Sequence, residues 1–252
     1  MRLVFLVLSS GALLFCLGCS SARKGDQDRA LLHMQIGTGY LSQGQYPQAM
    51  SELLQAEKLD PENPLILNNV GLAYYVRGRS GQAEAKFRQA IRLKKDFSDA
   101  KNNLARVLMD LDRASEALRL LTEVEGDLVY PFPEKTLSNL GMAHFYLGNF
   151  AKAEDYLARS LQMRRDSCAT ANFYGRTLLE LKRTQQSATV LDQAIEFCRS
   201  SKFEEPLYFS AMSYFTLGQR EKSRARLEEL LKEYPKSKYV AKAKGMLELL
   251  QQ

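Results

Sequence analysis

The sequence predicts an all-α protein made of consecutive helical hairpins, and three observations lead to that prediction. Residues 64–97 place small side chains at positions 8, 20 and 27 of a 34-residue unit, with large side chains at positions 11 and 24. The same small-residue columns recur along the chain at intervals of 34, 34, 36, 34 and 36 residues. Apolar residues make up 45% and charged residues 25%, which is ordinary for a folded protein. Because all three columns follow the same uneven series of intervals, we infer six copies of one unit.

The small-residue columns indicate how each unit folds. Position 8 is Gly37, Gly71, Ala105, Gly141, Gly175 and Ala211. Position 20 is Ala49, Ala83, Ala117, Ala153, Ser187 and Ser223. Position 27 is Ala56, Ala90, Val124, Ser160, Ala194 and Leu230. Small side chains there let two antiparallel helices approach closely, and Gly78 between them suits a helix end. The pattern resembles the tetratricopeptide repeat, and this resemblance implies a right-handed superhelix of six hairpins.

The predicted repeats fill most of the chain. They span residues 30–63, 64–97, 98–131, 134–167, 168–201 and 204–237. The two-residue insertions fall between hairpins, one near Pro131 and Pro133 and one near Phe203 and Pro206, because loops tolerate extra residues. Residues 238–252 predict a capping helix, since an array of repeats needs its last apolar face covered. Its apolar stripe is Tyr239, Ala243, Met246, Leu247 and Leu250.

The first 18 residues predict a signal peptide that is not part of the fold. Arg2 supplies the positive start, and an interrupted apolar stretch follows it. Residues 16–19, CLGC, resemble the end of a bacterial lipoprotein signal, although Cys16 and Leu17 depart from the usual residues. The resemblance implies acylation of Cys19, and several acyl chains give a lasting membrane attachment. A plain secretory signal cleaved nearby and an uncleaved anchor remain as alternatives.

Residues 19–29 predict a lipidated, flexible tether, because the segment after Cys19 is polar and lacks periodicity. In lipoproteins with similar signals, an Asp after the acylated Cys favours retention in the inner membrane. Ser20 stands at that position, so the predicted location is the outer membrane, with the repeats facing the periplasm. About ten extended residues reach roughly 33 Å, which would hold the repeats slightly off the bilayer.

Cys168 and Cys198 are the two cysteines of the predicted repeat array. The first begins one helix of the fifth repeat and the second lies near the end of the other, so antiparallel packing brings them together. In an oxidising periplasm this arrangement predicts a disulfide. Two free buried thiols are the alternative.

No catalytic constellation, cofactor motif or metal site is predicted. The sequence has no Gly-rich phosphate loop and no nucleophile in a strand–turn–helix context. His33 and His144 are the only histidines and occupy packing positions of the repeats. The net charge of +6 is spread over the chain, which argues against nucleic-acid binding, and no small-molecule substrate is indicated. Acidic pairs such as Glu204 and Glu205 are expected on solvated helix faces.

A partner-binding groove is implied by the resemblance, because the first helices of tetratricopeptide repeats line the concave side. The candidate partner-binding residues are Leu31, Met34, Leu41, Asn68, Leu72, Tyr75, Asn102, Arg106 and Phe145. The apolar members form a trough suited to an amphipathic segment, and the two asparagines are placed to hydrogen-bond a peptide backbone. The alternative is that curvature of the array buries these side chains against adjacent repeats.

The lipoprotein signal, the short tether and six repeats together resemble the pilotin lipoproteins of type IV pilus biogenesis, the PilF, PilW and Tgl family. Residues 35–61 and 67–91 are the segments most similar to that family. The resemblance implies a non-enzymatic protein that binds secretin subunits and, through its own acyl anchor, promotes their outer-membrane localisation and multimerisation. The alternative is a lipid-anchored scaffold for another envelope complex, in outer-membrane protein assembly or cell-wall synthesis.

Overall fold

The computed structural model describes residues 11–251, with side chains described for residues 24–199 and 201–251, and every regular element in this part is a helix. The elements are α1 (Gly11–Ser42), α2 (Tyr46–Leu59), α3 (Pro64–Tyr75), α4 (Ser80–Leu93), α5 (Ser98–Asp110), α6 (Ala114–Glu125), α7 (Pro133–Tyr146), α8 (Phe150–Met163), α9 (Cys168–Glu180), α10 (Thr184–Cys198), the short 3-10 helix η1 (Arg199–Ser201), α11 (Glu205–Thr216), α12 (Arg220–Glu233) and α13 (Val240–Gln251). The predicted all-α class is confirmed.

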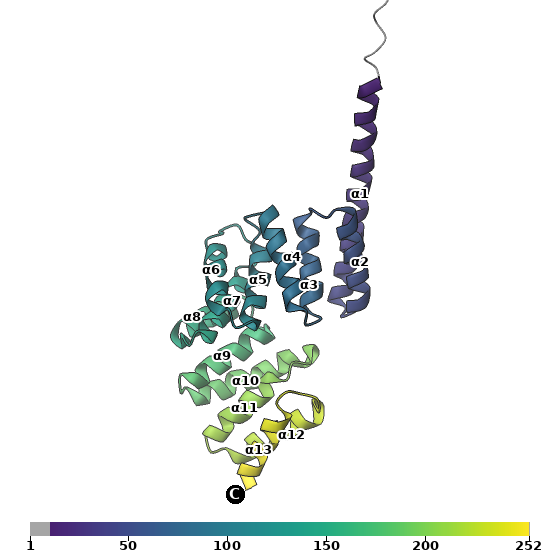
Figure 1. The fold of residues 1–252 in the computed structure, drawn as a ribbon. Helices are drawn as coiled ribbons and strands as arrows, with labels where there is room; N and C mark the ends of the chain where they lie inside the picture. The colour runs from purple at the N-terminus through teal and green to yellow at the C-terminus, as the bar shows by residue number, and fades with distance from the viewer. Residues whose placement is uncertain (1–10, 252) are drawn as a thin grey trace, which may run out of the picture. The chain divides into compact units, whose positions relative to one another are not determined.

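The chain divides within α5 into two compact units, Met1–Val107 and Leu108–Gln252. In the first unit α1 packs against α2, α2 against α3 and α3 against α4, so that two hairpins lie side by side. In the second unit the helices from α6 to α13 pack in chain order, as Figure 1 shows for α7 to α12. The first helices of successive hairpins also meet, because α7 contacts α9 and α9 contacts α11.

The predicted close approach of paired helices is visible at position 8 of the repeats. A Cβ added at Gly71 would lie 2.6 Å from Cε1 of Phe87, and one added at Gly141 would lie 2.5 Å from Cγ of Leu157. The residue opposite position 8 is the large residue of position 24, and all six such residues are fully buried: Leu53, Phe87, Leu121, Leu157, Leu191 and Leu227. Each hairpin therefore builds its core from one small and one large residue that meet across the helix pair.

The turns inside the hairpins share one backbone conformation. Position 15 of each repeat has a positive φ, between 58° and 74°: Gly44, Gly78, Asp112, Gly148, Lys182 and Gly218. At the second turn, the amide of Arg79 donates to the carbonyl of Tyr74 (3.0 Å) and the amide of Gly78 to that of Tyr75 (2.9 Å). This pair of bonds satisfies the last carbonyls of the helix and fixes the direction in which the chain turns back.

The structure differs from the sequence prediction over residues 19–29. These residues lie inside α1 rather than in an irregular tether. The physical reason is that the segment has no proline and only one glycine, Gly25, so nothing in it terminates a helix that is already held further along. Ala30 is the first described side chain in the core, and residues 24–29 are mostly exposed. The predicted signal peptide lies largely outside the described residues, as does the side chain of Cys19.

None of the described helices combines the length and apolar character needed to cross a bilayer.

Both two-residue insertions appear as departures from the regular hairpin spacing. The helix α6 ends at Glu125, and residues 126–132 form a loop before Pro133 opens α7. The second insertion follows α10, where η1 ends on Lys202 with a φ of 52° before α11 begins. The loop after α6 leaves several of its apolar side chains exposed, Leu128 and Val129 among them.

The C-terminal helix α13 covers the end of the second unit. Tyr239, Ala243 and Leu250 are buried in a cluster with Leu227 and Leu230 of α12. Met246 and Leu247 pack against the same cluster. All five residues of the predicted apolar stripe thus contribute to one contact surface, which closes the apolar face that α12 would otherwise expose.

Candidate functional site

The predicted groove residues of the first unit come from α1, α3 and α5. Leu31 is exposed on α1, whereas Met34 and Leu41 are half-buried and pack against the core of the first hairpins. Leu72 on α3 is also half-buried. Exposed apolar side chains nonetheless remain on these first helices, at Leu31 and at Leu65. The first unit therefore keeps an accessible apolar strip that its own side chains do not cover.

The two groove asparagines are engaged inside the protein. The side chain of Asn68 is buried, and its oxygen accepts a hydrogen bond of 2.9 Å from Nδ2 of Asn103. Asn102 is fully buried, and its Nδ2 donates to the carbonyl of Ser98 at 3.2 Å. Their placement differs from the expectation that both would face a bound peptide. The Asn68–Asn103 bond joins the first helices of the second and third repeats, whereas the Asn102 bond stays within α5.

Arg106 of α5 and Tyr75 of α3 contact each other. The guanidinium of Arg106 lies 5.7 Å from the centre of the Tyr75 ring, a cation–π distance. Arg106 is exposed and Tyr75 half-buried, so both remain accessible to a partner.

In the second unit, Phe145 belongs to a cluster of aromatic rings around Arg176. The guanidinium of Arg176 lies 4.7 Å from the ring centres of Phe145 and Phe173, and 4.5 Å from that of Phe209. These rings come from α7, α9 and α11, the first helices of three hairpins. Arg176 therefore fills the space beside Phe145 that was predicted to hold a partner. In this part of the second unit, the groove side chains pack against adjacent repeats, as the alternative prediction had it.

Glu205 holds the other side of the cluster. Its carboxylate accepts hydrogen bonds from Nδ2 of Asn172 (2.9 Å), the guanidinium of Arg176 (3.2 Å), the ammonium of Lys238 (2.8 Å) and the hydroxyl of Tyr239 (2.8 Å). Burial by itself would raise the pKa of Glu205, but these donors, Lys238 first, lower it below its ordinary value. Glu205 stays ionised and joins α9, α11 and the capping helix.

The expectation that Glu204 and Glu205 share a solvated face is wrong for Glu205, which is buried. Sequence reasoning missed it because its partners lie 29 to 34 residues away, on α9 and in the segment just before α13. The repeat pattern gave no signal for it. Position 2 also carries a charge in the third and fourth repeats, at Asp99 and Lys135, and neither of these is buried.

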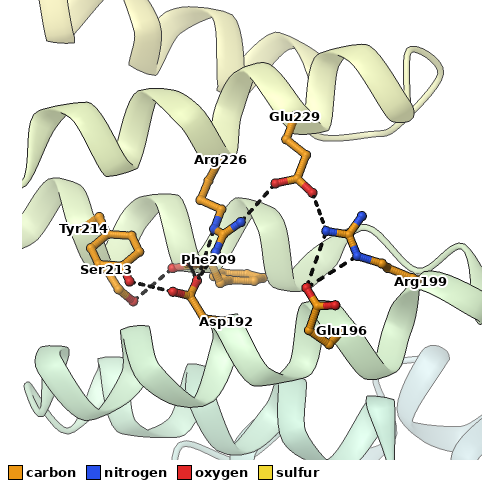
Figure 2. Close-up of polar contacts among 9 residues, drawn as sticks. Asp192, Glu196, Arg199, Phe209, Ser213, Tyr214, Arg226 and Glu229 are labelled. Carbon is orange, nitrogen blue, oxygen red and sulfur yellow. Dashed lines mark hydrogen bonds and ion pairs between the residues drawn. The ribbon is translucent and has the colours of Figure 1, made fainter.

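A second polar network joins α10, α11 and α12, as Figure 2 shows. Asp192 accepts hydrogen bonds from Ser210 (2.7 Å), Tyr214 (2.6 Å) and Arg226 (3.1 Å). Arg226 also binds Glu229 at 3.0 Å. Burial, and then the bond to Asp192, raises the pKa of Tyr214 to about 12. The Asp192 carboxylate thus accepts bonds from α11 and α12, so this network joins the last two hairpins.

Glu229 lies at the edge of the same network and also forms an ion pair with Arg199 at 3.0 Å. Arg199 forms a second ion pair with Glu196 at 3.4 Å. Figure 2 shows the four charged side chains from Arg226 to Glu196 in alternation. Such exposed pairs contribute little individually.

The two repeat-array cysteines are joined in the structure. Cys168 at the start of α9 and Cys198 at the end of α10 form a disulfide with a Cα–Cα distance of 5.1 Å. The bridge closes a stretch with a sequence separation of 30 and holds the open end of the fifth hairpin.

The histidines have structural surroundings. His33 Nδ1 lies 2.6 Å from a carboxylate oxygen of Glu52, which ties α1 to α2. His144 is buried and stacks on Tyr156 with 5.5 Å between ring centres. Burial, and then the charge of Lys152, lowers the pKa of His144. Among the described residues, no three His, Cys, Asp or Glu side chains lie together as metal ligands.

Comparison with known families agrees with the hairpin geometry. Models described as TPR repeat or tetratricopeptide repeat match residues 37–78, 71–127, 133–200 and 207–237. The matches cover both units and every hairpin. The chain is a tetratricopeptide repeat protein. Its glycines at position 8, its left-handed turns and its buried position-24 residues are the tetratricopeptide pattern realised in this sequence.

Among curated proteins, this tetratricopeptide repeat protein is similar to the type IV pilus assembly protein PilF of Pseudomonas aeruginosa, with 26% identity over 150 residues. The alignment spans 59% of each chain. Among solved structures, Pseudomonas aeruginosa PilF gives a TM-score of 0.67 at 21% identity, covering 84% of this chain and 95% of that one. PilW, described as a widely conserved type IV pilus biogenesis factor, gives a TM-score of 0.71 at 22% identity. That match covers 88% of this chain and 98% of the PilW chain. At these identities the structural likeness shows a shared fold.

Proposed function

We propose that this protein is an outer-membrane lipoprotein that binds secretin subunits and promotes their outer-membrane localisation and multimerisation for type IV pilus assembly. The observation that carries the proposal is the sequence similarity to PilF of Pseudomonas aeruginosa, which is named as a type IV pilus assembly protein. The fold likeness to PilF and PilW over most of the chain supports it.

The membrane-attachment step rests on Cys19. Acyl chains on this residue would anchor the protein through the N-terminal end of α1, whose packed part begins at Ala30. Eleven helical residues span about 16 Å, so the hairpins would stay near the bilayer surface. A secretin subunit bound to the hairpins would then be carried to the membrane that holds the anchor, and would be concentrated where multimers form.

The binding step rests on the apolar strip of the first unit. Leu31 and Leu65 lie exposed on α1 and α3, which pack against each other. An amphipathic segment of the partner would bury these side chains and remove apolar surface from water. Arg106 and Tyr75 are accessible polar groups of the same unit. In the second unit, Arg176 and Glu205 pair with each other and occupy the inner face of its own hairpins.

Replacing Cys19 by Ala tests the anchor. The variant should keep its helical circular dichroism, because Cys19 precedes the packed part of α1, and the secretin should no longer be recovered as outer-membrane multimers. Fractionation of envelopes and gels without heating measure this. Secretin multimers that still reach the outer membrane would contradict the proposal. Pull-down from envelope extracts that recovers outer-membrane protein assembly or cell-wall components in place of secretin would favour the scaffold alternative.

A charge placed on the strip tests the binding surface. Leu31→Glu combined with Leu65→Glu should weaken secretin capture by about tenfold or more, because two apolar contacts are lost. Leu93→Glu on α4 is the matched control, since Leu93 is equally exposed elsewhere in the first unit. Equal capture by the double variant and the control, or loss of helical signal in the double variant, would rule out this surface.

A further inference from the structure

The loop between α6 and α7 carries the most exposed large apolar side chains among the described residues. Leu128 is 96% exposed and Val129 is 88% exposed. Phe132 in the same loop is 49% exposed, and Met163 at the end of α8 is 61% exposed. We call these four side chains the apolar tip. Apolar surface gathered at one place in this way indicates a contact that the isolated chain does not make.

The apolar tip has a fixed base. Tyr130 and Met163 line one small cavity of about 180 Å³ together with Val124, Pro133 and Arg159, so the loop and the end of α8 are neighbours. Tyr130 and Phe132 meet edge to face with 5.8 Å between ring centres. The loop is also held by its own backbone. The amide of Val129 donates to Oδ1 of Asp127 at 3.3 Å, and the amide of Tyr130 to the Asp127 carbonyl at 3.2 Å.

Two prolines stiffen the loop further, because Pro131 and Pro133 each fix φ. A loop that is already ordered loses little conformational entropy when its tip is buried. The tip is therefore suited to insertion as it stands, without rearrangement.

The shape and surroundings of the tip favour a lipid surface. The apolar side chains project from a loop and from a helix end, and a protruding apolar tip fits the soft interface of a bilayer without a matching pocket. Tyr130 at the base provides the ring type that favours the level of the headgroups. Arg159, Arg164 and Arg165 lie on and just after the end of α8 and are exposed. Asp155 and Asp166 oppose the first two only as exposed pairs, which are weak.

We propose that the apolar tip inserts into the interfacial region of a phospholipid bilayer, with the arginines at the end of α8 contacting lipid phosphates. The contact goes beyond the proposed function, because it concerns how the second unit meets the membrane rather than which protein it carries. A chain already anchored at its N-terminus would need only a weak second contact, since anchoring raises the local concentration of lipid.

The chain contains no tryptophan, so one introduced tryptophan reports a single place. In Val129→Trp, adding vesicles of phosphatidylethanolamine and phosphatidylglycerol should shift the emission to shorter wavelength, and brominated lipids should quench it. Leu249→Trp on α13 is the matched control, because Leu249 is an exposed apolar residue of the same unit, and its emission should not change. Adding Leu128→Glu to Val129→Trp should lower vesicle partition of the tip by about tenfold or more.

Vesicles of phosphatidylcholine alone separate the affinity due to apolar insertion from that due to the arginines. The apolar tip should still insert, but the arginines should contribute less to vesicle affinity because these vesicles carry no net negative charge. Equal quenching at positions 129 and 249, or none at 129, would overturn the proposal. A blue shift at 129 that grows with protein concentration without lipid would assign the tip to a second copy of the chain. A blue shift at position 129 that appears only when purified secretin is added would assign the apolar tip to secretin binding. Leu31→Glu and Leu65→Glu introduced into the Val129→Trp chain should leave the quenching unchanged, so failure of secretin binding and failure of membrane insertion are distinguishable.

Discussion

At position 8, a glycine decides how closely two helices pack. Gly37, Gly71, Gly141 and Gly175 each leave room for the branched or aromatic residue of position 24, whereas Ala105 and Ala211 occupy the same position in the other repeats. The difference is local, because the third and sixth hairpins each have room for one methyl group. The spacing of small and large residues along the sequence was sufficient to predict this packing.

Gly71→Ala should destabilise the first unit by about 1–3 kcal/mol, since the new Cβ would overlap the Phe87 ring and force it to move. Gly39→Ala is the control within the same unit, because nothing lies within 4 Å of a Cβ added at Gly39. That change should be neutral or stabilising by up to about 1 kcal/mol through helix propensity. Urea unfolding followed by circular dichroism measures both. Equal midpoints for the two variants would show that the Phe87 ring adapts without cost.

At the scale of elements, the fifth hairpin has the features that depart most from its neighbours. Its turn places Lys182 at a positive φ where four of the other hairpins have glycine. Its position 20 is Ser187, where the first four repeats have alanine and the sixth has Ser223. Ser187 is compensated by hydrogen bonds to the carbonyl of Gly175 (2.8 Å) and to Ser213 (2.9 Å). The disulfide between Cys168 and Cys198 adds a covalent constraint to the same hairpin.

Reduction of this disulfide should lower the stability of the second unit by about 3–4 kcal/mol, because the unfolded chain regains the freedom of a loop with a sequence separation of 30. Cys168→Ser combined with Cys198→Ser should show the same loss and become insensitive to reductant. Intact mass under denaturing conditions, which rises by two hydrogen atoms on reduction, establishes the bridge. Identical urea midpoints with and without reductant would contradict a stabilising role.

At the scale of the whole molecule, stability is divided among interfaces between neighbouring hairpins, with no single central core. The long-range polar contacts therefore matter where several helices meet, as they do around Glu205 in the second unit. His144 in the same unit is buried and stacks on Tyr156. Both groups have a lowered pKa, although for different reasons. Burial lowers that of His144, and the donors around Glu205 outweigh its burial.

The fold should lose stability in two steps as the pH falls. Because the pKa of His144 is lower in the fold than its ordinary value of 6.5, its contribution is present above that pH and is lost as the pH falls through the folded value. Glu205 should lose its contribution at lower pH. Its pKa is also lowered in the fold, so its contribution to stability is present above the ordinary pKa of 4.5 and is lost as the pH falls through the folded value. Urea midpoints should fall between pH 7.5 and 5 less in His144→Leu than in the parent chain. Leucine occupies the same position in two other repeats, at Leu108 and Leu178. Parallel pH profiles would contradict this assignment.

The sequence by itself determined the hairpins, because each one depends on small and large residues at fixed spacing within 34 residues and on a turn position that accepts a positive φ. It also placed Cys168 and Cys198 at adjoining helix ends. Only the tertiary structure decided which inner-face residues are accessible. Asn102 and Glu205 are buried, and Arg176 is enclosed by three rings from three helices, an arrangement that no local pattern reveals. Whether a polar side chain faces solvent or a neighbouring helix depends on packing between repeats, and that packing joins residues far apart in the chain.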